Sequence, residues 1–66
     1  MEIIVNGDPH QIPQGTSIAD LLMQFKLNPC ALAIEVNQEL KPRNVHRATF
    51  LSDGDVLEIV TLVGGG

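Results

Sequence analysis

The pattern of apolar and polar positions divides the chain into several extended runs and one helical segment. Residues 2–5 and 56–63 are apolar and β-branched, which predicts two strands buried in a sheet. Residues 30–36 alternate larger apolar side chains with small or charged ones, which predicts a third strand with one apolar face. Residues 9–12 fit an edge strand and residues 39–41 at most a short one, because a proline begins or borders each.

Turn residues separate these runs. Asn6 and Gly7 predict a tight hairpin between the first two strands, because Asn-Gly accepts the positive φ angles of a type I′ turn. Asn37 and Gln38 turn the chain again after the third strand. Residues 53–55, Asp-Gly-Asp, form the last turn, which leads directly into the final strand.

The helical segment begins near residue 17. Ser17 is suited to cap the helix, and Asp20, three residues later, is suited to complete a capping box. The apolar residues that follow fall at intervals of three and four, which places them on one stripe of a short helix. The stripe, which we expect to pack in the core against the sheet, consists of Ile18, Leu21, Leu22 and Phe25.

Length and composition limit what the chain can do. Its 66 residues predict one small domain, covering 1–66, with too little material for both a core and an enclosed catalytic pocket. We therefore expect a protein that is acted upon or that binds, rather than an enzyme. Four Lys and Arg against eight Asp and Glu give a net charge of −4, which disfavours nucleic acid as a partner.

The cellular location is predicted from what the sequence lacks. Its apolar runs are far shorter than the roughly 20 residues that span a bilayer, and its first residues do not form a secretory signal. A single cysteine, Cys30, leaves no internal disulfide to form. These features predict a cytoplasmic protein with no membrane partner.

The chain ends in three glycines. Residues 61–66 predict a flexible tail, in which Gly64, Gly65 and Gly66 let another protein's backbone approach closely. Alternatively, these glycines are a frayed end or a cloning remnant. A carboxylate at Gly66 is a poor electrophile until one oxygen becomes a leaving group, so a working tail requires activation.

Other side chains with chemical potential are few. His10 has no Cys, Asp or Glu at ligand spacing, so we expect a solvated strand histidine and no metal site. Cys30 has no neighbouring His or Lys to activate its thiol, so we expect a small buried hydrophobic residue. Lys41, Arg43 and Arg47 gather three of the four basic residues into one segment. This segment is either an ordinary solvated loop or a docking patch, with Arg43 as a possible partner contact.

A hairpin, a helix, a strand, a short strand and a last strand, in that order, predict an α+β domain. One helix covers one face of a mixed sheet of four to five strands, and either Phe50 or Leu51 inserts beneath that sheet. This arrangement indicates the β-grasp, or ubiquitin-like, fold, in which the last strand lies centrally beside the first. The two most continuously apolar runs of the chain are the ones placed in the middle.

An ordered set of short motifs runs along the whole chain: Gly15-Thr16-Ser17-Ile18, Leu21-Leu22, residues 33–37 (Ala-Ile-Glu-Val-Asn), Pro42-Arg43, residues 53–55 and Gly65-Gly66. Together, rather than through any single motif, they make the chain resemble the sulfur carriers of thiamine biosynthesis, the ThiS family. One departure is His46, because family members often carry an aromatic residue after the Pro-Arg pair.

The resemblance implies a cycle of chemistry at Gly66. An adenylyltransferase of the ubiquitin-activating type would convert its carboxylate to a glycyl adenylate, using ATP and Mg²⁺, which the carrier itself would not bind. A cysteine desulfurase or other donor would supply sulfur, giving 1-thioglycine at Gly66 for delivery to thiazole synthase. Gly64 and Gly65 would thread the partner's groove, and catalysis would belong to the partners.

Other functions stay open at this point. The same activated end serves a ubiquitin-like protein modifier, which finishes in an isopeptide bond to lysine. It also serves a carrier for another sulfur pathway, such as that of molybdopterin. A plain β-grasp binding module would not need the glycines at all.

Overall fold

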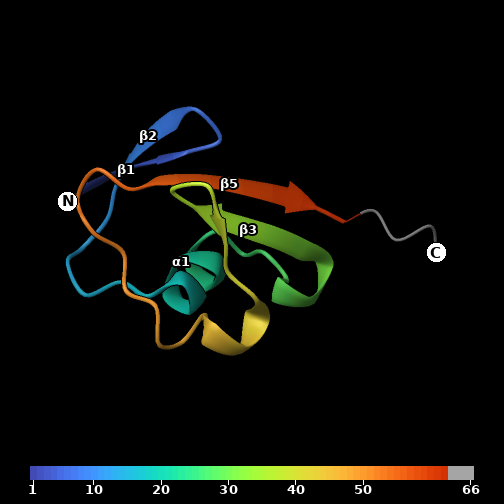
Figure 1. Cartoon of the computed structure of the whole chain (residues 1–66). Coiled ribbons are helices and arrows are strands. Elements are labelled where there is room, and N and C mark those ends of the chain that lie inside the picture. The colour runs from blue at the N-terminus through green and yellow to red at the C-terminus, as the bar shows by residue number, and fades with distance from the viewer. Residues whose placement is uncertain (63–66) are drawn as a thin grey trace.

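The computed structural model describes residues 1–62 of the chain. These residues form one sheet with a single α-helix against it, and two short 3-10 helices lie in the connections (Figure 1). The predicted hairpin, helix and later strands appear in the expected order. The elements are β1 (Glu2–Val5), β2 (Asp8–Gln11), α1 (Ile18–Gln24), η1 (Pro29–Ala31), β3 (Leu32–Val36), β4 (Glu39–Leu40), η2 (Arg43–Val45) and β5 (Val56–Thr61).

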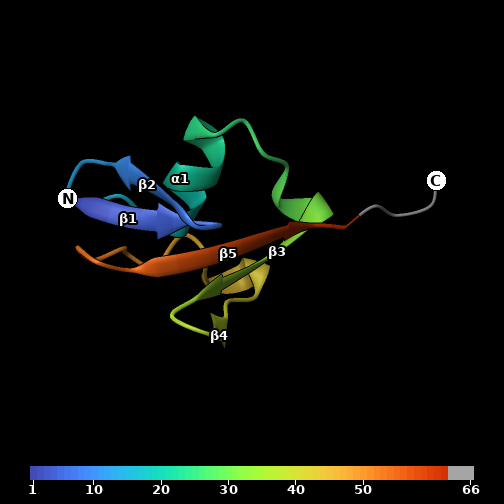
Figure 2. The same cartoon turned by 90° about the horizontal axis from the view of Figure 1, so that it is seen from above.

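The five strands form a mixed sheet in the order β2-β1-β5-β3-β4. Strand β5 lies in the middle, parallel to β1 and antiparallel to β3, and the two outer pairs are antiparallel. Helix α1 covers one face of the sheet, and within residues 1–62 no helix covers the other (Figures 1 and 2). The predicted β-grasp arrangement, with the last strand beside the first, is confirmed.

The hairpin turn and the helix start have the geometry that the sequence predicts. Asn6 and Gly7 both have positive φ angles, 50° and 87°, as a type I′ turn requires. At the helix start the Asp20 N–H donates to the Ser17 hydroxyl oxygen at 3.1 Å, and the Ser17 N–H donates to the Asp20 carboxylate at 3.2 Å. This capping box satisfies two backbone donors that the helix itself leaves open.

The core lies between α1 and the sheet. Ile18, Leu21 and Leu22 are buried there, as their helical spacing predicts. Phe25, the fourth residue of the predicted stripe, is only partly buried, because the helix ends one residue earlier and Phe25 is its C-cap. The Phe25 ring contacts His10, with ring centroids 5.0 Å apart. His10 is therefore half-buried at the sheet edge rather than the solvated residue that we expected.

The structure corrects the expectation for Cys30 and decides between Phe50 and Leu51. Cys30 was expected in a strand and buried, but it lies in η1 and is exposed. The reason is local, because β3 begins only at Leu32 and the Asn28 side chain accepts the Cys30 N–H at 2.9 Å to cap η1. Of the pair Phe50 and Leu51, Leu51 is buried and Phe50 is 62% exposed.

Strand β5 ends at Thr61, inside the predicted strand run 56–63, and it includes the first residue of the predicted tail. Thr61 pairs with Leu32 of β3, and the Leu62 N–H donates to the Ala31 carbonyl oxygen at 2.7 Å. The expected flexible tail at 61–66 is therefore wrong in its first two residues, because pairing with β3 and η1 holds them. Residues 63–66 lie outside the described part of the chain.

Candidate functional site

The predicted reacting groups lie beyond the described residues. Gly64, Gly65 and Gly66 are outside 1–62, so the roles predicted for them stay predictions. The structure does fix the end of β5, the last element before them in the sequence. We call this end of β5 the exit; it lies beside η1 and the start of β3 (Figure 2).

The face of the sheet opposite α1 is apolar with acidic side chains. Along β5 the exposed residues alternate with the buried Leu57 and Ile59. The residues paired with these exposed positions on β1 and β3 lie on the same face, and so does the β4 residue paired with Glu35. We call this surface the outer face; its residues are Ile4, Ala33, Glu35, Leu40, Val56, Glu58 and Val60.

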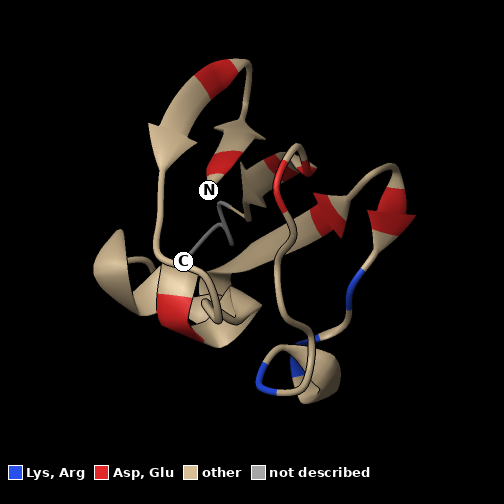
Figure 3. Ribbon diagram, turned by 90° about the vertical axis from the view of Figure 1, so that its left-hand side faces the viewer, with Lys and Arg blue, Asp and Glu red and all other residues tan. Residues whose placement is uncertain are grey.

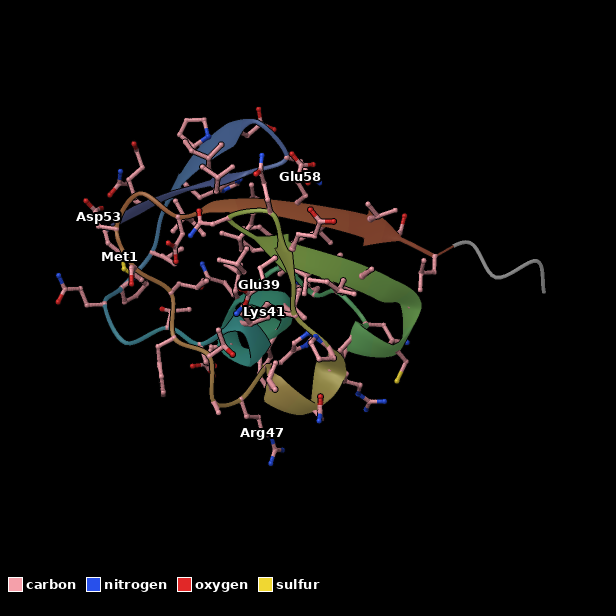
Figure 4. All side chains as sticks on the ribbon, in the orientation of Figure 1. Met1, Glu39, Lys41, Arg47, Asp53 and Glu58 are labelled. Carbon is pink, nitrogen blue, oxygen red and sulfur yellow. The ribbon has the colours of Figure 1, made fainter. Side chains whose placement is uncertain are left out.

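Two carboxylates lie side by side in the middle of the outer face. Glu35 and Glu58 are directly opposite partners in the β3–β5 register, and Glu58 projects from β5 away from α1 (Figure 4). Like charges in such positions destabilise a strand pair. The ion pair found within residues 1–62 joins Lys41 to Glu39, so neither carboxylate has such a partner there. The outer face therefore suits a partner that brings a Lys or Arg to an apolar contact.

The segment predicted as a docking patch lies around η2, apart from most of the acidic residues (Figure 3). Lys41 is engaged by Glu39, and this hydrogen bond and charge hold the pKa of Glu39 below its usual range. Arg43 and Arg47 are exposed and have no ion-pair partner within residues 1–62. Arg47 points away from the body (Figure 4). The structure thus places Arg43 with Arg47 beside α1, not on the outer face.

A groove of about 650 Å³ lies between α1 and η2. Its floor is apolar and comes from α1 and the segment that follows it, whereas its other side carries the two arginines. We call it the helix groove. Its residues are Ala19, Leu22, Met23, Leu27 and Pro29 on the first side, and Arg43, Asn44, His46 and Arg47 on the second.

His46 joins the two sides of the helix groove. Its side chain is 5% exposed, and Nε2 lies 2.8 Å from the Lys41 carbonyl oxygen. Because a carbonyl oxygen only accepts, Nε2 donates its proton to it, and Nδ1 is an acceptor in the neutral ring. Nδ1 is buried and has no hydrogen-bond partner among the described residues. The His46 carbonyl oxygen accepts the Ala19 N–H at 3.2 Å, which ties η2 to the helix.

Three further features bear on function: a possible metal site, a possible membrane-spanning helix and Cys30. Within residues 1–62 no three His, Cys, Asp or Glu side chains are grouped as a metal site requires. No helix in the same part of the chain is long and apolar enough to cross a membrane. Cys30 is exposed in η1, one residue before the Ala31 carbonyl that holds Leu62.

Sequence reasoning missed the Glu35–Glu58 pair and the helix groove. The pair depends on the β3–β5 register, which aligns residues 23 positions apart (58 minus 35) without any local motif. The groove depends on how η2 folds back onto α1. The one signal in the sequence was the unusual His46, which the structure places in a buried position that suits a flat ring.

The sheet order, the central last strand and the single helix define a ubiquitin-like β-grasp domain. The ThiS family model matches residues 3–66, so the chain belongs to the ThiS family. A crystal structure of the thiamine biosynthesis protein ThiS from Geobacter metallireducens superposes with a TM-score of 0.82 at 31% identity, covering 100% of both chains.

Two relatives add information about the family. The sulfur carrier protein ThiS of Escherichia coli (strain K12) is 27% identical over 66 residues, which is 100% of both chains. A thiazole synthase of Magnetococcus marinus is 36% identical over all 66 residues of this chain. The match covers only 20% of that longer protein, so the resemblance is to one segment of it.

Proposed function

We propose that this chain carries sulfur as a thiocarboxylate at Gly66 and delivers it for the thiazole part of thiamine. The observation that carries the proposal is the match to the ThiS family over residues 3–66, which includes the glycine run. The full-length similarity to the E. coli sulfur carrier supports the carrier role. The segment shared with a thiazole synthase supports that enzyme as the acceptor.

The chemistry begins at the Gly66 carboxylate. A carboxylate oxygen attacks the α-phosphorus of ATP on the activating enzyme, pyrophosphate leaves with Mg²⁺ neutralising its charge, and a mixed anhydride with AMP forms. A sulfur nucleophile then attacks the carbonyl carbon and AMP leaves. Where the nucleophile is a persulfide, a thiol reduces the resulting S–S bond and is itself oxidised to a disulfide, which leaves the thiocarboxylate on the chain.

The folded body presents the tail and holds the partner. The exit beside η1 fixes where the tail starts, because Leu62 is hydrogen-bonded to Ala31. The outer face is the surface next to β5 that is free to contact the activating enzyme, with apolar residues around Glu35 and Glu58. A Lys or Arg of that enzyme would neutralise the two carboxylates.

The proposal is tested by ATP–pyrophosphate exchange on the activating enzyme. Adding one alanine after Gly66 keeps a carboxylate but moves it about 3.5 Å along the tail. A misplacement near 1 Å can already cost about a hundredfold in rate, so exchange should be lost. Gly65→Val should fail as well, because its side chain adds bulk and restricts φ.

Melting curves and intact masses complete the test. Both variants should melt like the parent, because neither change touches the core described above. The parent isolated from its own cell should show the mass increase of one sulfur in place of one oxygen, whereas a protein modifier would instead show conjugates to lysine. Exchange at the parental rate in either variant would contradict the role of the glycine end.

A further inference from the structure

The helix groove carries an exposed apolar side chain that is not part of the core. Met23 is 76% exposed on α1, and it lines the groove together with the partly buried Leu27 and Pro29. A methionine side chain is flexible and adapts its shape to what it contacts, which suits a binding surface. An open groove of about 650 Å³ with such a floor accommodates one or two aliphatic side chains of another protein.

The charge of the groove is opposite to that of the molecule. The chain has a net charge of −4, yet two of its four basic residues, Arg43 and Arg47, line this one groove. Within residues 1–62 neither has an ion-pair partner, whereas the nearby Lys41 is already paired with Glu39. A guanidinium presents several donors in a plane and binds carboxylates in preference to other groups of a protein. The groove therefore selects a segment with carboxylates.

The groove wall is fixed in advance. The hydrogen bond from the Ala19 N–H to the His46 carbonyl oxygen, 3.2 Å, holds η2 against α1. The His46 side chain is buried, and its Nε2 donates to the Lys41 carbonyl oxygen at 2.8 Å, which fixes the ring against the segment that leads into η2. A bound segment therefore meets a preformed surface, which lowers the cost of ordering side chains on binding.

We propose that the helix groove docks a segment of a partner protein in which an aliphatic side chain is flanked by aspartates or glutamates. Helix α1 and η2, which line the groove, lie on one side of the sheet (Figure 1), and the outer face is the other side, so both surfaces can be occupied at once. The proposal goes beyond the sulfur-carrier function, because it does not use the glycine tail. It predicts a second partner contact that persists when the tail is inactive.

The test uses a phage-displayed library of random linear peptides, selected on the intact chain. Enriched sequences should combine leucine, isoleucine or methionine with at least two acidic residues. Their synthetic peptides should bind the double variant Arg43→Glu/Arg47→Glu at least about tenfold more weakly, because two attractions become two repulsions at the groove. Met23→Asp should weaken the same peptides, and peptides with lysine in place of their acids should prefer the double variant to the parent.

Matched controls locate the binding site. Lys26→Glu reverses a charge at an exposed residue outside the groove and should leave the affinity within about twofold, as expected of a screened surface charge. Val60→Asp alters the outer face and should have no effect. Melting curves of all variants exclude unfolding as the cause of lost binding.

Several results would overturn the proposal. These are no enriched sequence, enriched sequences without acidic residues, equal binding to the double variant, or loss of binding in Val60→Asp. Sedimentation velocity of the chain alone should show a monomer. A dimer that the double variant dissociates would assign the groove to a second copy instead.

Discussion

At the scale of a single residue, Leu22 belongs both to the core and to the lining of the helix groove. It is 2% exposed in the core beneath the sheet, and it also lines the helix groove. Its neighbour Met23, by contrast, is 76% exposed. Replacing Leu22 therefore tests packing in the core, whereas replacing Met23, in the same turn of α1, tests an exposed position of the groove.

Replacing Leu22 by alanine should lower the free energy of unfolding by about 2–5 kcal/mol, because a buried cavity replaces packed atoms. That is a large part of the roughly 5–15 kcal/mol that stabilises a typical domain. Met23→Ala is the matched control and should change the free energy by no more than about 0.5 kcal/mol. Urea unfolding measures both, and equal midpoints for the two variants would contradict this assignment of the core.

Cys30 is exposed, so its replacement should have little effect on stability or on sulfur transfer. Cys30→Ala should unfold within about 0.5 kcal/mol of the parent, as most exposed substitutions do. It should also form the thiocarboxylate at a near-parental rate with the activating enzyme and sulfur donor. A folded Cys30→Ala protein that forms no thiocarboxylate would give the thiol a chemical role at the tail exit.

At this scale the sequence predicts residues whose role is local. The Ser17–Asp20 capping box needs only two side chains three residues apart, and it was predicted correctly. The exposure of Cys30 and Phe50 was not, because it depends on where β3 starts and how the loop before β5 lies. Those positions are set by pairing with distant strands.

At the scale of the element, the side chains of Asn6 and Asn37 hold strand β5 in place. Strand β1 pairs with β5 only through Ile4 and Val5, so the next part of β5 has no neighbour on that side. The Asn6 side chain takes its place, accepting the Ile59 N–H at 2.7 Å and donating to the Ile59 carbonyl oxygen at 3.1 Å. On the other side Asn37 accepts the Val56 N–H at 3.0 Å. The turn residues therefore also complete the sheet.

Removing the Asn6 side chain should destabilise β5. Asn6→Gly keeps the positive φ angle but loses two hydrogen bonds, which should cost about 1–3 kcal/mol. Asn6→Ala loses the same bonds and adds strain of about 1 kcal/mol at φ 50°. Thermal melts should therefore rank the parent above Asn6→Gly, and Asn6→Gly above Asn6→Ala. Glycine and alanine variants that melt together with the parent would show that the contacts to Ile59 contribute nothing.

The strands themselves were predicted well because their apolar, β-branched runs bounded by Asn-Gly and Asp-Gly turns are strong local signals. The boundary between β5 and the tail was not, because the predicted strand run and the predicted tail overlap, and the boundary depends on partners of Thr61 and Leu62 that lie about 30 positions earlier in the chain. The same long-range register produces the Glu35–Glu58 pair.

At the scale of the whole molecule, the chain has an acidic, apolar outer face and a basic helix groove on the opposite side of the sheet. The sequence indicated Arg43 as a possible partner contact within a basic segment. The structure separates Arg43 from the outer face, because η2 lies on the side of α1 (Figure 1). The β-grasp fold was predicted because it follows from element order, whereas the groove follows from loop packing.

The outer face should carry the affinity for the activating enzyme. Val60 is 58% exposed beside the carboxylate pair, and Val60→Asp adds a third charge there. ATP–pyrophosphate exchange should then show a raised apparent KM with kcat largely kept, because a docking contact binds ground and transition states alike. Phe50→Asp makes the same kind of change at a residue outside both surfaces and should be neutral. Equal KM values for both variants and the parent would place the contact elsewhere.

In the proposed cycle, the hydrogen bond from Leu62 to Ala31 sets a length limit for every partner that reacts at Gly66. Gly66 lies four residues after Leu62 in the sequence, and four fully extended residues span at most about 13–14 Å. Each of the proposed partners would then have to bring its reacting atoms within that distance of the same edge of the sheet. A channel deeper by one residue, about 3.5 Å, would exclude this chain without a single unfavourable contact. The end of β5 would then act as a gauge that unrelated partners share.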